Sequence, residues 1–114
     1  MIRQKLTVLL ESGIINQETH DYCLRVLSFL LENKIIDEDA QADVFLTHLA
    51  MADARRQEGN AIVDKLDDFI LNEIHADAKF EEAKILWKKL EENEFEASEL
   101  DYFYLHIINM IKEG

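Results

Sequence analysis

The stretch FLTHLAMADARRQEG, Phe45–Gly59, decides how we expect this chain to fold, because it joins a helical pattern of apolar residues to a histidine. Residues three or four positions apart lie on one face of a helix. One such face would carry Val44, His48, Met51, Ala52 and Arg55. Gly59 then stands where a helix commonly ends. The stretch therefore predicts a helix with His48 on an apolar face and Arg55 two turns further on.

A second segment, SELDYFYLHIINM, Ser98–Met110, places another histidine among aromatic and aliphatic residues. Ser98 is of a type preferred at a helix N-cap, and an acidic residue such as Glu99 suits the first turn. The same spacing rule puts one set of side chains on a common face: Glu99, Tyr102, His106, Asn109 and Met110. Since Glu99 precedes His106 by about two turns, we expect Glu99 to be able to orient His106.

The rest of the chain also favours helices. It has no proline and three glycines in 114 residues, and 48% of it is hydrophobic. Proline and glycine are the residues least compatible with helix interiors, and this apolar content suffices for one core. We therefore predict an all-α, compact bundle of five to six helices in a single domain, residues 1–114.

The expected helices follow from caps and apolar spacing. They span Ile2–Glu11, a segment from an Asn16 N-cap through Asn33, Glu38–Gln57 after an Asp37 N-cap, Asn60–His75, Asp77–Glu91 and Ser98–Lys112. The fourth would carry Ile62, Leu66, Phe69 and Ile70 at helical spacing.

Charge narrows the range of partners. The formal net charge is −12, from 24 acidic and 12 basic residues. Nucleic acids and anionic membrane surfaces attract basic faces, and this chain offers only the short cluster Arg55-Arg56. We expect no direct nucleic-acid binding, no membrane, and a protein partner with a basic surface. The single cysteine, Cys23, excludes an internal disulfide, which fits a cytoplasmic location.

The residues alone leave two interpretations of His48 and His106 open. A histidine on an apolar helix face is commonly a packed core residue, and the chain would then be a non-enzymatic helical protein-interaction module with structural histidines. Neutral imidazole is also a nucleophile that can carry a covalent phosphoryl group. Such a group adds about −1.5 to −2 charges. Arg55 and Arg56 would stabilise that charge and Glu99 would oppose it.

A metal site is a third interpretation. His48, His106 and Glu99 would form a set of two imidazoles and a carboxylate. The sequence lacks the H-x-x-x-H and H-E-x-x-H spacings of compact metal sites. We therefore expect no metal and no other cofactor.

Together, the two histidine segments resemble the PTS regulation domain (PRD), a helical module of bacterial sugar-operon antiterminators and transcriptional activators. The first family motif, H-(I/L)-x-x-A-x-x-R-x-x-x-G, is matched by His48, Leu49, Ala52, Arg55 and Gly59. The second, E-x-x-F/Y-x-x-L-H-I, is matched by Glu99, Tyr102, Leu105, His106 and Ile107. The spacing of 58 residues between the histidines also fits the family, and the resemblance covers the chain from about Asp21 to its end.

The resemblance implies a PRD-like bundle that forms homodimers. It implies that His48 and His106 are phosphoacceptors, modified by components of the phosphoenolpyruvate-dependent sugar phosphotransferase system. The donor would be the phosphocarrier protein or a sugar-specific transporter subunit. The chain would be a phosphorylation target rather than an enzyme, and would regulate transcription or carbohydrate metabolism through a partner.

Two features depart from the family pattern. Thr47 precedes His48, where an acidic residue is common in the family. No output domain accompanies the regulatory one, so we expect a stand-alone, antiterminator-like regulator.

Overall fold

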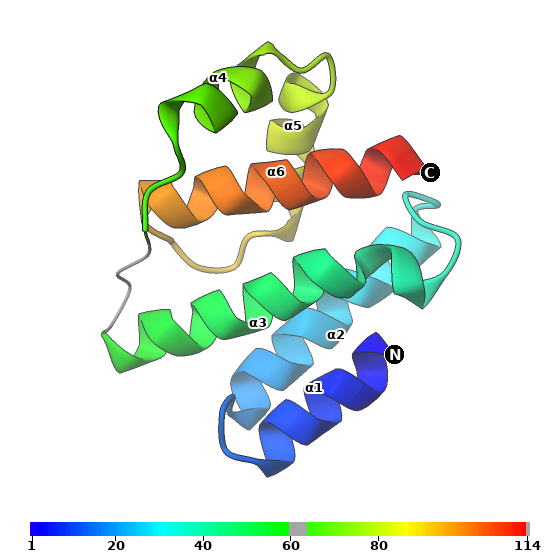
Figure 1. Ribbon diagram of the computed structural model, residues 1–114. Coiled ribbons are helices and arrows are strands. Elements are labelled where there is room, and N and C mark those ends of the chain that lie inside the picture. The colour runs from blue at the N-terminus through cyan, green and yellow to red at the C-terminus, as the bar shows by residue number, and fades with distance from the viewer. Residues whose placement is uncertain (60–63, 114) are drawn as a thin grey trace.

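The computed structural model describes residues 1–59 and 64–113, and these residues are mostly helical (Figure 1). The described ranges form α1 (Ile2–Glu11), α2 (Gln17–Glu32), a short 3-10 helix η1 (Asp39–Ala42), α3 (Asp43–Glu58), α4 (Asp68–Ala76), α5 (Phe80–Leu90) and α6 (Ala97–Glu113). The radius of gyration, 13.7 Å, is close to the roughly 13 Å of a compact domain of 100 residues. The predicted all-α, compact bundle of five to six helices is confirmed. No helix in these ranges combines the length and apolar character needed to cross a membrane.

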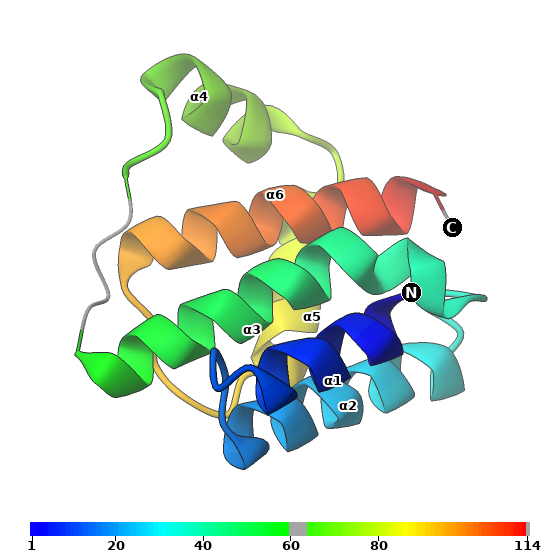
Figure 2. The ribbon, with the colours of Figure 1, turned by 60° about the horizontal axis from the view of Figure 1, so that its bottom comes forward.

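Helices α3 and α6 form the central pair of the bundle. They lie side by side and run in opposite directions, as Figures 1 and 2 show from two sides. Helices α1 and α2 pack on α3, whereas α4 and α5 pack on α6. The antiparallel arrangement sets the C-terminal turns of α3 beside the N-terminal turns of α6.

Caps explain where two of these helices begin or end. The Asn16 side chain accepts a hydrogen bond from the Thr19 backbone N–H at 2.9 Å, as predicted for the start of α2. Gly59 ends α3 with φ 75°, a left-handed conformation that glycine adopts at little cost.

The core lies between the central pair and the helices that cover it. Phe103 on the inner side of α6 meets Phe45 of α3 edge to face at 6.3 Å, and its ring centroid is 4.8 Å from that of Trp87 on α5. All three side chains are nearly fully buried. Phe103 points inward. Tyr102, which precedes it, and His106, one turn after Tyr102, lie on the side of α6 that meets α3.

The third predicted helix starts differently from expectation. It begins as η1, and α3 proper starts at Asp43. The N-cap of η1 is Glu38, not Asp37, because Gln41 forms a capping box with Glu38. Asp37 instead donates its backbone N–H to the Gln41 side chain at 2.7 Å.

The fourth and fifth helices are shorter than predicted, and the sixth extends one residue further at each end. The predicted start of the fourth helix at Asn60 lies outside the described residues, as does Ile62. Residues 64–67 are not helical. Helix α4 begins after Asp67, whose side chain accepts a hydrogen bond from the Phe69 N–H at 3.0 Å. Helix α5 starts at Phe80 rather than Asp77. Helix α6 starts at Ala97, so Ser98 lies within its first turn and is not the N-cap.

The cap of α2 generates a stability prediction. We expect Asn16→Ala to lower the free energy of unfolding by about 1 kcal/mol, because the Thr19 N–H loses its acceptor. Urea denaturation followed by circular dichroism measures the change. Asn16→Ser supplies another capping oxygen and should retain most of the stability; equal losses in both variants would contradict the capping role.

Candidate functional site: two histidines between α3 and α6

His48 and His106 lie next to each other, although 58 residues separate them in the sequence. Their ring centroids are 5.2 Å apart and the ring planes are tilted by 52°. His48 belongs to α3 and His106 to α6, and the antiparallel packing of these helices brings the two positions together. Sequence periodicity placed each ring on its own helix face; the structure makes them parts of one site.

The ring of His48 is held by aromatic neighbours from α6. It stacks on Tyr102 with a centroid distance of 5.2 Å and an angle of 18° between the planes. The ring of Phe103 meets it at 82° and 5.7 Å. The His48 side chain remains 21% exposed. Its orientation is therefore restricted while part of it faces solvent.

Glu99 and Arg55, the two predicted supporting residues, bind each other. Nη2 of Arg55 donates to both carboxylate oxygens of Glu99, at 3.0 and 3.1 Å, and Nε approaches one of them at 3.3 Å. Glu99 is 1% exposed, whereas Arg55 is 30% exposed. The pair thus joins the last turn of α3 to the first turn of α6.

Glu99 lies beside His48, which corrects the expectation that it would orient His106. Its Oε1 is 3.5 Å from Nε2 of His48, and no hydrogen bond joins the two atoms. The structure gives no polar contact between Glu99 and His106 in the described ranges. Two turns of one helix separate Glu99 from His106, whereas the facing helix brings His48 within reach.

Both imidazoles are biased towards the neutral form. Burial lowers the pKa of His48; the nearby Glu99 carboxylate partly offsets this effect, and the Arg55 charge adds to it. Burial, together with the charge that His48 would carry, lowers the pKa of His106 to about 4. At neutral pH each ring therefore keeps a nitrogen lone pair, the form that can act as a nucleophile.

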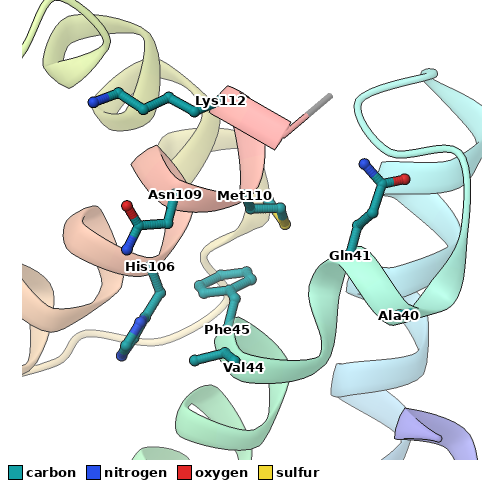
Figure 3. A pocket seen from close by; sticks show the side chains of 8 residues that line it. All are labelled: Ala40, Gln41, Val44, Phe45, His106, Asn109, Met110 and Lys112. Atoms are coloured by element: carbon teal, nitrogen blue, oxygen red, sulfur yellow. The ribbon is translucent and has the colours of Figure 1, made fainter.

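Two surface hollows meet at His106. One, of about 420 Å³, is lined by Lys5, Asp43, Val44, Thr47, His48, Met51, Arg55 and His106. The other, of about 470 Å³, is lined by Ala40, Gln41, Val44, Phe45, His106, Asn109, Met110 and Lys112 (Figure 3). In Figure 3 the His106 ring lies next to Val44 and Phe45, between α6 and α3. A group entering either hollow can therefore reach His106, and one entering the first can also reach His48.

Lys5 is a site residue that the sequence analysis missed. It reaches the first hollow from α1 and pairs with Asp43 at 2.5 Å, a contact that lowers the pKa of the Asp43 carboxyl. Helical periodicity describes one helix at a time and does not predict which residues of α1 face α3. No signal in the sequence marked Lys5.

The second predicted arginine has a different setting. Arg56 pairs with Asp53, which is buried and also accepts hydrogen bonds from Thr19 and Gln57. This cluster joins α3 to α2. The two adjacent arginines therefore face different neighbours.

The metal interpretation gains no support from the geometry. In the ranges 1–59 and 64–113, no three His, Cys, Asp or Glu side chains are arranged to hold a metal ion. The Glu99 oxygens, which would be the carboxylate ligands, receive hydrogen bonds from Arg55.

Comparison with known proteins gave no relative: no family model, no curated protein and no solved structure matches this chain. The resemblance to PRD domains therefore rests on the two motifs. The structure places their polar and aromatic members in one site: His48, Arg55, Glu99, Tyr102 and His106. Three apolar members, Leu49, Ala52 and Ile107, belong to the core.

The lowered pKa of His106 can be measured directly. We expect its ring signals to titrate near pH 4 in an NMR pH series, because burial opposes the charged form. The pKa of an unfolded histidine is about 6.5, so on acidification the unfolded chain binds the proton first. The free energy of unfolding therefore decreases as the pH is lowered from about 6.5 to about 4. In His48→Gln the pH midpoint of the His106 titration should rise, because the positive charge that His48 can carry no longer opposes protonation of His106. A midpoint of about 6 or above in the wild type would contradict the description of the site.

Proposed function

We propose that this chain is a regulatory domain of the phosphotransferase-system type, in which His48 and His106 accept a phosphoryl group and the chain is a target rather than an enzyme. The observation that carries the proposal is the pair of imidazoles with centroids 5.2 Å apart, where the His48 side chain is 21% exposed and the His106 side chain lines two hollows. Two rings in such a setting combine nucleophilic nitrogens with access for a donor.

The transfer is a single exchange of nitrogen–phosphorus bonds. A lone pair of the acceptor imidazole attacks the phosphorus of a phosphohistidine on the donor. The new N–P bond forms as the donor N–P bond breaks, and that electron pair returns to the donor nitrogen. The acceptor keeps the proton on its other nitrogen, so no further base is required.

Charges around the site fit a phosphoryl group that is bound and released reversibly. Arg55 and Lys5 line the first hollow and supply positive charge. Glu99 and Asp43 are already paired with them, so an added dianion competes with existing partners. This balance suits a regulatory modification better than a permanent one.

The resemblance to PRD domains supplies the partners of the proposal. The donor is the phosphocarrier protein or a sugar-specific transporter subunit in the cytoplasm, and a basic donor surface would complement the net charge of −12. A homodimer whose packing changes on phosphorylation would carry the signal to a regulator of transcription or carbohydrate metabolism.

One observation favours the alternative of a helical interaction module with structural histidines. His48 stacks on Tyr102 and is mostly buried, as a purely structural ring would be. The alternative requires only that the rings stabilise the fold. It does not require that either nitrogen react.

Phosphorylation in vitro separates the two functions. We expect the chain, incubated with phosphoenolpyruvate and purified phosphotransferase components, to gain an acid-labile phosphoryl group. His48→Ala/His106→Ala should lose the label, while His75→Ala, a change at an exposed histidine of α4, should keep it. Circular dichroism of each variant checks that the fold persists. Equal labelling of the wild type and the double variant, or no label on either, would contradict the proposal.

A further inference from the structure

We infer that Nδ1 of His48 is the nitrogen that accepts the phosphoryl group on this ring, and that Glu99 is the positioning residue that keeps the ring proton on Nε2. This inference rests on the proposed function and adds which atom reacts. It follows from the asymmetric surroundings of the two ring nitrogens.

Nε2 of His48 is closed to a donor. It is buried, makes no hydrogen bond in the described part of the chain, and faces Oε1 of Glu99 at 3.5 Å. Glu99 is itself 1% exposed and fixed by Arg55. A phosphoryl group on Nε2 would have to displace this carboxylate and would meet its negative charge.

The same carboxylate selects the tautomer of the neutral ring. A lone pair on Nε2 would lie 3.5 Å from a negative oxygen and be repelled by it, whereas an N–H there is attracted by it. The proton therefore resides on Nε2, and the lone pair on Nδ1. Nδ1 makes no hydrogen bond with the described residues and, unlike Nε2, is not among their buried unpaired atoms. The His48 side chain is 21% exposed and lines the first hollow, and we take Nδ1 as the nitrogen that a donor reaches there.

Glu99 also stabilises the product. Attack through Nδ1 forms the new N–P bond while the proton stays on Nε2, so the phosphorylated ring carries a positive charge there until that proton leaves. Glu99 lies beside this charge at 3.5 Å. Arg55 holds the carboxylate in place and lines the hollow into which the phosphoryl group projects.

The tautomer can be measured without any phosphorylation. In protein labelled with ¹⁵N-histidine, long-range ¹H–¹⁵N correlation spectra at about pH 8 should show the His48 proton on Nε2 and an unprotonated Nδ1. In Glu99→Gln, Arg55 can hold the amide oxygen and leave the NH₂ group facing Nε2, so the ratio of Nε2–H to Nδ1–H should fall by about tenfold. Glu99→Asp retains a carboxylate and should shift this ratio less.

The phosphorylated atom is then read in His106→Ala, where His48 is the remaining ring of the site. The ¹⁵N–³¹P coupling of the labelled, phosphorylated variant should place phosphorus on Nδ1. Adding Glu99→Gln should lower the yield of this isomer by about tenfold. Phosphorus on Nε2, or a wild-type proton on Nδ1, would overturn the inference.

The two readouts distinguish this inference from the proposed function. A wild-type ring with its proton on Nδ1 overturns the inference whether or not the chain is phosphorylated. Label on Nε2 overturns the inference and leaves the acceptor function standing. Absence of label on either histidine overturns the function, and the inference with it. If Glu99→Gln fails to fold, the wild-type tautomer and the isomer formed in His106→Ala still decide.

Discussion

The ion pair between Arg55 and Glu99 determines the geometry of the site. A carboxylate that is 1% exposed has lost almost all of its water, which costs several kcal/mol unless a partner replaces it. Arg55 replaces it with two N–H groups. Because Arg55 lies in the last turn of α3 and Glu99 in the first turn of α6, the pair requires these two helix ends to be adjacent. The antiparallel register then places His48 opposite Tyr102 and beside His106.

A second buried carboxylate shows what a purely structural role looks like. Asp53 accepts hydrogen bonds from Thr19 at 2.7 Å, from Arg56 at 3.0 Å and from Gln57 at 3.0 Å, and joins α3 to α2. Each group in that cluster has a partner. At Glu99 the neighbouring Nε2 of His48 is buried without a hydrogen bond. Buried polar atoms left unpaired are uncommon, and they require an explanation. The proposed phosphorylation would provide one at His48, because the Nε2–H would then carry a positive charge beside the Glu99 carboxylate.

The sequence predicted the helices better than their contacts. Caps and apolar spacing are local properties, so the limits of α1 and the Asn16 cap of α2 could be predicted. The starts of η1 and α4 could not, because Gln41 and Asp67 offered competing caps to the backbone.

The site was predictable in its members and not in its arrangement. The motifs named His48, Arg55, Glu99 and His106, and these four residues do lie together. The prediction paired Glu99 with His106 of the same helix, whereas Glu99 lies beside His48 of α3. Contacts between helices depend on the register of packing, which no single-helix pattern encodes. For the same reason, the position of Lys5 at the site could not be predicted.

If His48 and His106 form one phosphoacceptor site, the number of phosphoryl groups on one chain tests this most directly. Two groups of charge about −1.5, on rings whose centroids are 5.2 Å apart, repel by several kcal/mol at an effective dielectric constant of about 20. Intact-mass spectrometry at neutral pH, after exhaustive transfer from the phosphotransferase components, should therefore show a single added phosphoryl group. His48→Ala and His106→Ala should each still accept one. A chain that readily carries two groups would contradict the shared site, and a chain that carries none would contradict the function.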